Sequence, residues 1–280
     1  MLAKDSFDLS PMRFPISGGA HRLATSPTAV ILAAGRGSRM CHLTAETPKC
    51  LAEINGKTLL DHQIGALRAS GINDIIVVAG YEDEQIAEAA GSRAAIIRNL
   101  DWESTNSLYS LSLCRDFIAG PCLVLNSDVL FDTSLIQLLL DSGGNTFAFD
   151  SASGHDDEHM KVELENGRLV QMSKLLDVTK SHGENVGVLH FCGRTIDLLF
   201  DAIDEAIDSC GRNAWLASAV ERLAMKVPLY GVDISEQPWI EIDYPEDLQR
   251  AREVTWPAID LLRANPWPQA EAARCVNGAM

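Results

Sequence analysis

Residues 29–40 read AVILAAGRGSRM, six apolar residues followed at once by a glycine-rich turn. A short apolar run that ends at a glycine predicts a buried strand feeding a loop. Gly35 and Gly37 allow the backbone of that loop to approach a ligand closely and to point N–H groups at phosphate oxygens. The stretch therefore predicts the first strand of an α/β sheet and, after it, a cradle for phosphate.

Two other phosphate-binding motifs do not fit this loop. Met40 stands where a dinucleotide-binding fingerprint needs its third glycine, which makes a dehydrogenase a weak alternative. A Walker loop would need Gly-Lys-Ser or Gly-Lys-Thr, and neither follows. A plain glycine turn with solvated cations is the structural alternative.

The chain downstream alternates apolar, extended runs with segments of helical periodicity. Such alternation implies crossover connections and a mainly parallel sheet. Beyond Asp128 the rhythm changes, and Asn166-Gly167 between two apolar runs predicts a hairpin with a primed turn. The expected helices are 58–70, 82–90, 107–116, 195–208, 214–225 and one that opens at 244–247; the expected extended runs are 28–34, 74–80, 95–98, 122–126, 160–164, 168–172, 227–232 and 239–242.

We expect one Rossmann-like α/β domain with a mainly parallel mixed sheet flanked by helices. It carries a small β-hairpin subregion, which we expect on the side that binds a second substrate, the acceptor. The expected division is a flexible N-terminal extension at 1–27, the domain at 28–256 with its subregion at about 145–192, and a weakly periodic tail at 257–280.

Composition excludes several functional classes. The formal net charge of −16 argues against general affinity for a nucleic acid backbone, which needs clustered Lys and Arg. Seven cysteines without a CxxC pair disfavour a zinc site or a disulfide framework, so a reducing cytoplasm is the expected setting. No run approaches the roughly 20 apolar residues of a membrane span, and the first residues lack the apolar core of a signal peptide. We expect neither a nucleic acid nor a membrane partner.

A second motif strengthens the phosphate hypothesis. Residues 44–51, TAETPKCL, place Lys49 beside the rigid Pro48, where it can return toward the glycine loop. Arg39 and Lys49 would then form a clamp of two cations. Together the two segments resemble the signature of the nucleotidyltransferase superfamily that makes NDP-sugars and CDP-alcohols.

The resemblance covers roughly residues 28–253 and implies specific roles. The arginine and lysine that match Arg39 and Lys49 grip the NTP phosphates in that family, and the backbone near the first glycines reads the base. It follows that the nucleotide would be contacted by Leu32, Ala33, Ala34, Gly35, Gly37, Ser38, Gly80 and Tyr81.

Two acids are candidate metal ligands. Asp128 ends an apolar strand at the carboxyl edge, where open α/β sheets place their ligands. Asp243 lies in a run, WIEIDYPEDL at 239–248, that resembles the closing motif of the family, in which this aspartate completes the metal site. Mg²⁺ suits such a site because it often takes one or two carboxylates and fills its remaining positions with phosphate and water. Each aspartate alone could be a solvated turn acid or a helix cap, and Glu241 could assist the metal or be a surface residue.

The polar and aromatic segment 99–111 points to one branch of the superfamily. Ser104, Thr105 or Asn106 could simply cap the following helix. The segment also resembles phosphocholine and 2-aminoethylphosphonate cytidylyltransferases, where residues matching Asn106 and Ser107 lie near the nucleotide, and it departs from the Gly- or Gln-rich stretch of sugar-1-phosphate enzymes. Residues 156–162, 172–174 and 183–188 resemble the same branch.

The acceptor side follows from that resemblance. Lys174 matches the lysine that holds the acceptor phosphate, and Lys161 is a weaker candidate, although lysines at strand ends are commonly solvated. An acceptor ammonium would suit acids and aromatic faces, and Trp102, Trp215 and the acids at 156–158 are available. The expected acceptor residues are Lys161, Lys174, Trp102, Glu184, Asn185 and Trp215.

These parts imply a Mg²⁺-dependent transfer of CMP from CTP to a small phosphorylated or phosphonate acceptor, with release of pyrophosphate. Because the acceptor oxygen is already anionic, no protein nucleophile is required. A sugar-1-phosphate or molybdopterin-type nucleotidyltransferase and a non-catalytic regulatory subunit are the alternatives. A homodimer is also possible.

Overall fold

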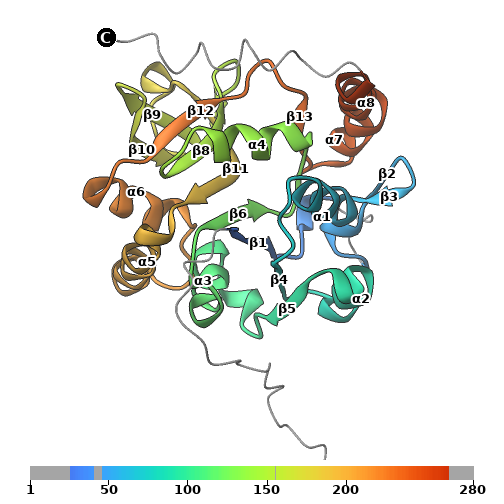
Figure 1. The fold of residues 1–280 in the computed structure, drawn as a ribbon, viewed down its shortest axis with the longest axis horizontal. Helices are drawn as coiled ribbons and strands as arrows, with labels where there is room; N and C mark the ends of the chain where they lie inside the picture. Colours follow the sequence, from blue (N-terminus) through green and yellow to red (C-terminus); the bar gives the residue numbers. More distant parts are fainter. Residues whose placement is uncertain (1–25, 41–45, 155, 265–280) are drawn as a thin grey trace, which may run out of the picture.

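A nine-stranded mixed sheet runs through the computed structural model, which describes residues 26–40, 46–154 and 156–264 (Figure 1). Its strand order is β5-β4-β1-β6-β11-β8-β12-β10-β9. The strands are β1 (Thr28–Ala33), β4 (Ile75–Ala79), β5 (Ala95–Arg98), β6 (Cys122–Asn126), β8 (Thr146–Asp150), β9 (Lys161–Glu165), β10 (Arg168–Ser173), β11 (Gly183–Phe191) and β12 (Tyr230–Asp233).

The first four strands of the chain's main sheet, β5, β4, β1 and β6, are parallel to one another. The apolar sequences of β4, β1 and β6 suit burial on both faces, as parallel sheets require, whereas β5 is a partly exposed edge strand. β11 then runs antiparallel to β6 and also pairs with β8 and β9. The pairings β11-β8-β12-β10-β9-β11 therefore form a closed ring. We call it the acceptor-side ring, because it includes strands of the subregion that we expected on the acceptor side.

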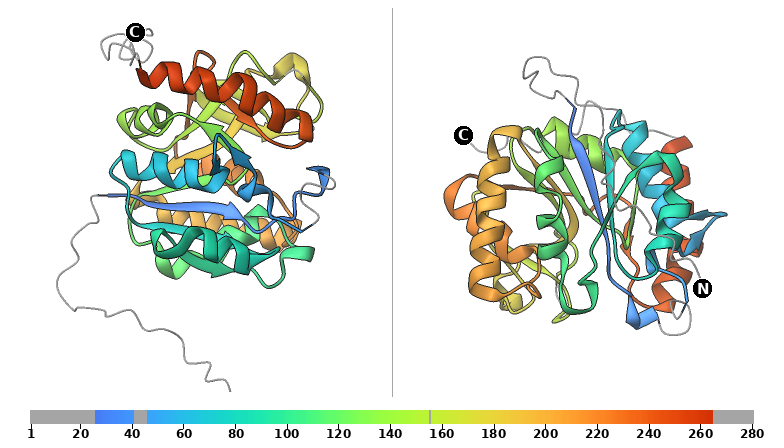
Figure 2. Two further views of the ribbon diagram at one scale, coloured as in Figure 1. Left: turned by 90° about the vertical axis from the view of Figure 1, so that its right-hand side faces the viewer. Right: turned by 90° about the horizontal axis from the view of Figure 1, so that it is seen from below.

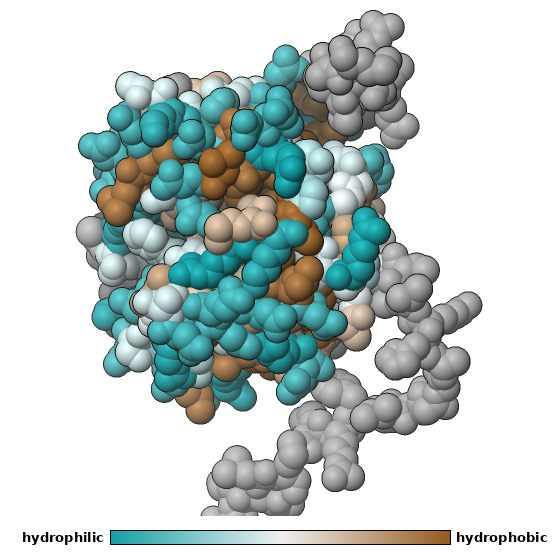
Figure 3. Space-filling view, turned by 90° about the vertical axis from the view of Figure 1, so that its left-hand side faces the viewer, coloured by the Kyte–Doolittle hydropathy of each residue, from teal (hydrophilic) through white to brown (hydrophobic). Residues whose placement is uncertain are grey.

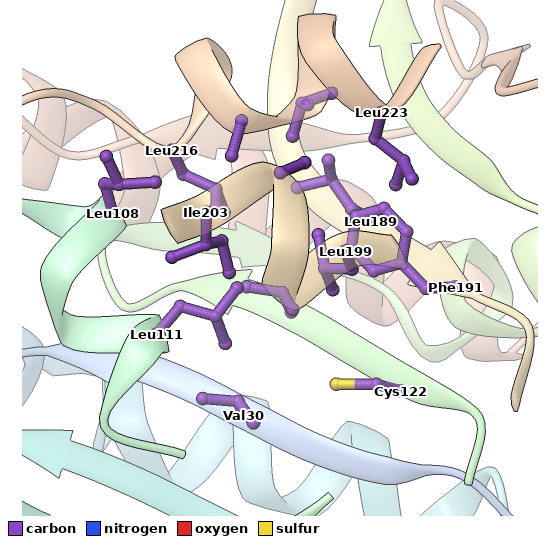
Figure 4. Close-up of a cluster of buried hydrophobic side chains, with 14 of the residues drawn as sticks. Val30, Leu108, Leu111, Cys122, Leu189, Phe191, Leu199, Ile203, Leu216 and Leu223 are labelled. Atoms are coloured by element: carbon purple, nitrogen blue, oxygen red, sulfur yellow. The ribbon is translucent and has the colours of Figure 1, made fainter. Parts of the chain in front are cut away.

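Helices cover both faces of the sheet (Figure 2). One layer consists of α1 (Leu59–Ala69), α2 (Asp83–Ala90) and α4 (Thr133–Asp141), and the other of α3 (Ser107–Ser112), α5 (Ile196–Cys210) and α6 (Ala217–Lys226). Alternation along β1 divides the core, because Val30 and Leu32 pack with the α3, α5 and α6 layer while Ile31 packs with the other. Figure 4 shows Val30, Leu108 and Leu216 in the first of these clusters.

A third cluster lies under the C-terminal helices. It joins two small sheets, the ladder of β7 (Val129–Phe131) and β13 (Trp239–Glu241) and the hairpin of β2 (Glu53–Ile54) and β3 (Lys57–Thr58). The helical part of the cluster consists of α7 (Pro245–Arg250), a π-helical turn (Ala251–Thr255) and α8 (Trp256–Ala264). Short 3-10 turns complete the described structure at Lys49–Leu51, Gly91–Arg93, Trp102–Ser104, Arg115–Phe117, Val178–Lys180 and Gly193–Thr195.

The α/β class with a mixed sheet between helices is confirmed. The predicted hairpin is also present, with Asn166 and Gly167 at φ 52° and 75°, as a primed turn requires. The expectation of weak structure from residue 257 onward was wrong for its first part, because α8 is helical to Ala264. The predicted helix at 107–116 ends at Ser112 and gives way to a 3-10 turn.

Residues 1–25 of the expected extension and 265–280 of the expected tail lie outside the described residues, as do Thr44 and Ala45 of the second motif. Within the described ranges, no helix has the length and apolarity needed to cross a membrane. The face on the side of β9, β10 and α6 is largely hydrophilic with apolar patches between (Figure 3).

Candidate active site

The glycine loop after β1 and the Pro48-Lys49 turn pack against each other. Gly37 adopts a φ of 67°, and a Cβ there would lie 2.8 Å from the Cβ of Lys49. Only glycine combines this backbone conformation with so close an approach. The side chain of Lys49 therefore passes beneath the loop, and the residue is 8% exposed. The expected return of Lys49 toward the loop is what the structure shows.

The β7–β13 ladder brings the two candidate metal ligands together. Asp128 precedes β7 and Asp243 follows β13, and because the strands are antiparallel these ends meet. The Ile242 N–H donates to the Asp128 carbonyl at 2.9 Å and extends the ladder to the site. One carboxylate oxygen from each of Asp128, Glu241 and Asp243 lies within 4.8 Å of the others.

Both predicted NTP-binding cations contact this acidic cluster. Lys49 Nζ lies 2.9 Å from Asp128 Oδ2 and 2.5 Å from Asp243 Oδ1. Arg39 Nη1 donates to Asp243 Oδ2 at 2.8 Å. Both cations of the clamp are thus paired with these acids. Residues near positions 39–49, 128 and 243 form one charged network.

The pKa values follow from burial and these contacts. Burial lowers the pKa of Lys49, but the charges of Asp128 and Asp243 outweigh it and raise that pKa above its usual value. Burial would raise the pKa of Asp243, but Lys49 and Arg39 outweigh it and lower that pKa. Burial, followed by the charges of Asp128 and Asp243, raises the pKa of Glu241 to about 8.

The acidic cluster fits a hard divalent cation. Asp128 Oδ1 is buried and has no hydrogen-bond partner among the described residues, which is unusual for a buried carboxylate oxygen. Three carboxylates within 4.8 Å offer the all-oxygen donor set that such cations prefer. The arrangement can hold a divalent metal beside the glycine loop.

The residues expected to contact the nucleotide form the carboxyl edge of β1 and β4. Leu32, Ala33 and Ala34 are buried, whereas Gly35 and Ser38 are exposed in the loop. The Tyr81 N–H donates to the Ala34 carbonyl at 3.0 Å and so ties the two strand ends together.

Trp102 packs on the same edge. A Cβ on Gly80 would lie 2.6 Å from the Cβ of Trp102, so glycine permits this contact. The rings of Trp102 and Tyr81 meet edge to face with centroids 5.4 Å apart, and Arg36 lies 5.2 Å from the Tyr81 ring centroid. Trp102, expected on the acceptor side, thus lies with the residues expected for the nucleotide.

Asn106 and Ser107 occupy the start of α3. Asn106 is its N-cap residue, and Asn106 Oδ1 accepts from the Ser107 N–H at 2.8 Å. Ser107 Oγ accepts from the Leu216 N–H at 2.9 Å. The capping role that we left open for this segment is therefore present at Asn106, and the Ser107 hydroxyl faces the segment that carries Trp215.

Lys174, Trp215 and Glu158 lie together on the acceptor side. Lys174 Nζ is 5.5 Å from the Trp215 ring centroid and 3.9 Å from Glu158 Oε2. The same Glu158 oxygen lies 3.2 Å from Arg39 Nη2. Glu158 thus connects the cation expected for the acceptor with one expected for the NTP.

Lys161 is enclosed in the acceptor-side ring. The residue is fully buried, and its Nζ donates to the carbonyls of Asp156 and Asp157 at 3.1 and 3.3 Å. These bonds shape the turn that carries Glu158 and leave Lys161 apart from the charged network around Asp243.

Glu184 and Asn185 begin β11. Ser153 Oγ donates to Glu184 Oε2 at 2.5 Å, and burial raises the pKa of Glu184. Asn185 Oδ1 is buried without a hydrogen-bond partner in the described part of the chain. Both residues lie on the acceptor-side ring, and the Glu184 carboxylate is already contacted by Ser153 and His159.

Sequence reasoning did not single out Asn126 at the end of β6. Gly187 of β11 has a φ of 80°, and a Cβ there would lie 2.5 Å from Asn126 Nδ2. The glycine thus makes room for an amide next to the strand end that leads to Asp128. The polar end of an otherwise apolar strand was the available signal.

Known proteins share parts of this sequence and its fold. The sequence model of the MobA-like NTP transferase domain matches residues 29–223. A bifunctional IPC transferase and DIPP synthase of Aquifex aeolicus is 28% identical over 232 residues, covering 80% of this chain and 51% of that protein. A choline-phosphate cytidylyltransferase of Streptococcus pneumoniae is 39% identical over 106 residues, covering 37% of this chain and 45% of that protein. The chain spans about half the length of these curated relatives.

Among solved structures, a CTP:phosphocholine cytidylyltransferase from Streptococcus pneumoniae superposes with a TM-score of 0.67 at 24% identity, over 82% of this chain and 99% of that one. At this identity the likeness shows a shared fold.

Proposed function

This chain belongs to the MobA-like NTP transferase family, and we propose that it is a magnesium-dependent cytidylyltransferase that transfers CMP from CTP to a small phosphorylated or phosphonate acceptor such as phosphocholine or 2-aminoethylphosphonate. The observation that carries the proposal is the network in which Arg39 of the glycine loop and Lys49 beneath that loop contact Asp128 and Asp243. It gathers phosphate-binding cations and oxygen ligands for a metal at one strand edge.

The proposed reaction is a direct displacement. An anionic oxygen of the acceptor attacks the α-phosphorus of CTP, a new P–O bond forms, and the bond to pyrophosphate breaks. Such a reaction depends on positioning and on neutralisation of charge. In this scheme the loop N–H groups from Gly35 to Ser38 orient the phosphates, and Arg39 and Lys49 turn from their acids to the phosphate oxygens.

Asp128 and Asp243 would hold the magnesium ion, with Glu241 beside them. A magnesium ion bound there supplies positive charge to the phosphates and to the departing pyrophosphate. The buried and unpartnered Asp128 Oδ1 supports this assignment.

The acceptor assignment rests on the aromatic and charged groups around Lys174. The Lys174 ammonium over the Trp215 ring shows a cation held on this ring face. We propose that an acceptor ammonium takes that position, next to the Glu158 carboxylate, while Lys174 turns to the acceptor phosphate. The names of the choline-phosphate relatives support the same chemistry.

A pyrophosphate-release screen tests the function. It crosses CTP, UTP, GTP and dTTP with phosphocholine, 2-aminoethylphosphonate, phosphoethanolamine and common sugar 1-phosphates, in Mg²⁺ and in EDTA. We expect turnover with CTP, Mg²⁺ and an ammonium-bearing acceptor, its near loss in Asp128→Ala, and no change in Asp116→Ala as the matched control. Turnover with UTP or dTTP and a sugar 1-phosphate would establish the alternative enzyme class.

Two broader assignments belong to this proposal. Free thiols at Cys50, Cys114 and Cys122, all buried, support a reducing cytoplasmic setting. The large apolar side chains exposed at Val170, Met225 and elsewhere support a homodimer, which sedimentation velocity tests. We propose no nucleic acid or membrane partner.

A further inference from the structure

The loop between α5 and α6, residues 211–216, carries Trp215 and is fastened to the segment before α3. Ser107 Oγ accepts from the Leu216 N–H at 2.9 Å, and the Asn106 N–H donates to the Arg212 carbonyl at 3.1 Å. Leu216 also belongs to the apolar cluster that contains Leu108 of α3 (Figure 4). Arg212 before Trp215 and Leu216 after it therefore both contact the start of α3.

Charged and aromatic groups add to this fastening. Arg212 Nη2 lies 2.8 Å from Asp101 Oδ2, and its guanidinium lies 3.7 Å from the Tyr109 ring centroid. Tyr109 Oη donates to the same Asp101 oxygen at 3.4 Å. The segment 101–109 therefore contacts the loop 211–216 at both ends of the loop. Asp101 contacts Arg212 at its beginning, and Ser107 contacts Leu216 at its end.

Trp215 depends on this loop for its position. Its side chain is 48% exposed, and the contact with Lys174 is at 5.5 Å, whereas the neighbouring Leu216 is 6% exposed. The bond from Ser107 fixes the backbone of that buried neighbour. The segment 101–109 also includes Trp102, which packs on Gly80 and Tyr81 at the nucleotide edge. One short segment consequently touches both substrate regions.

We propose that Ser107 is a positioning residue: its hydroxyl sets Trp215 for the acceptor and links the nucleotide edge to the acceptor site. The inference rests on the proposed function, because it takes Trp215 as an acceptor contact. It gives Ser107 a role different from direct contact with the nucleotide.

Steady-state kinetics separates the two roles. Ser107→Ala leaves a buried N–H without its acceptor and frees the loop, so we expect the KM of the acceptor to rise by about 5- to 50-fold while the KM of CTP stays unchanged. Ser107→Thr, which keeps the hydroxyl, should restore the wild-type value. Ser112→Ala is the control on the same helix, since Ser112 bonds only to its own helix through the Tyr109 carbonyl. A rise in the KM of CTP alone would overturn the proposal and make Ser107 a nucleotide ligand.

A double-mutant cycle tests the route through Trp215. In a Trp215→Ala background, Ser107→Ala should raise the acceptor KM by less than about 2-fold, because the aromatic ring that it positions is already gone. Fully additive effects would overturn the proposal.

A measurement that needs no enzymatic turnover tests the positioning role of Ser107 separately from the proposed function. In protein labelled with 5-fluorotryptophan, the ¹⁹F resonance of Trp215 is assigned from its loss in Trp215→Phe. We expect this resonance to shift or broaden in Ser107→Ala and to return in Ser107→Thr. An unchanged resonance would refute the positioning role, whereas absence of pyrophosphate release in the wild-type chain would refute the proposed function.

Discussion

Lys49 is held between two carboxylates, and the balance of charge around it depends on this one side chain. Asp128 and Asp243 lie within hydrogen-bond distance of its Nζ, and Glu241 completes the acidic group. Without the ammonium, three neighbouring carboxylates would face one another with only Arg39 to offset them. The lysine therefore stabilises the site as well as offering a contact for phosphate.

We predict that Lys49→Met lowers the stability of the metal-free protein by about 3 kcal/mol, the usual cost of removing one partner of a largely buried ion pair. A divalent cation should offset part of the loss because it restores positive charge between Asp128 and Asp243. Thermal unfolding in EDTA and in excess Mg²⁺ measures both effects. Exposed Lys57→Met is the matched control, and an equal loss in both solutions would show that no cation binds between these acids.

Arg39 and Lys174 should separate in their effects although Glu158 contacts both. Arg39→Ala should weaken binding of CTP with Mg²⁺, while Lys174→Ala should raise the acceptor KM and leave CTP binding nearly intact. Calorimetric titration of CTP into each variant measures the difference, with Lys226→Ala as a control outside the site. The reverse pattern would exchange the places that we propose for the two substrates.

At the scale of elements, the C-terminal helices pack on the ladder of β7 and β13 that joins Asp128 to Asp243. The run from α7 to α8 is helical over Pro245–Ala264, and Pro257 lies within it. A proline in a helix removes one N–H and crowds the carbonyl four residues earlier. The π-helical turn at Ala251–Thr255 directly precedes it and widens the helix at that point.

His62 connects α8 to α1. Its Nε2 lies 2.8 Å from the Ile54 carbonyl, and its ring lies 4.4 Å from that of Trp256, centroid to centroid. Burial is the main reason that the pKa of His62 is lowered from its usual value near 6.5. The folded state therefore favours the neutral ring.

We predict that this histidine makes the protein less stable in mild acid. Below pH 6.5 the unfolded chain takes up a proton that the folded chain refuses, so stability is full above that pH and falls as the pH drops, by at most about 1.4 kcal/mol per pH unit for one group. Urea unfolding at several pH values between 5 and 8 should show a shallower acid loss in His62→Gln than in the wild type. Parallel curves would assign the acid loss to other groups.

The strands that could be predicted from the sequence are those that are buried on both faces along nearly their whole length. β1, β4 and β6 are buried on both faces and read as continuous apolar runs, and the Asn166-Gly167 turn has its own signature. β11 escaped prediction because Glu184, Asn185 and Gly187 interrupt its apolar pattern and its pairing with β8 is irregular.

The parts of the site could be predicted, as could the approach of Lys49 to the glycine loop, but most of the other contacts could not. Asp128 and Asp243 meet through β7 and β13, three-residue strands that are too short to show a period. The bond from Ser107 to Leu216 joins residues 109 apart in sequence, and the two ion pairs of Glu158 depend on how the turn at 156–158 folds. Local sequence patterns carry no record of such long-range contacts.

At the scale of the whole molecule, the site brings cations together with carboxylates in a chain of negative net charge. The net charge is −16, yet Arg39, Lys49 and Lys174 converge at one edge of the sheet. Each of these cations contacts a protein carboxylate in the described structure. Substrate phosphates would therefore exchange places with carboxylates that already satisfy the same cations, which limits affinity and favours release of product.

The shared strand β11 restricts how this enzyme can move. It is hydrogen-bonded to β6 of the parallel half and to β8 and β9 of the acceptor-side ring, so a hinge between the halves would have to break a backbone ladder. We therefore predict that substrates are captured without clamshell closure, by loop movements at 35–40 and 156–160. Small-angle scattering should give the same radius of gyration with and without CTP and Mg²⁺, while hydrogen exchange slows in those loops. A clear contraction would mean that the sheet bends where its ladder is continuous.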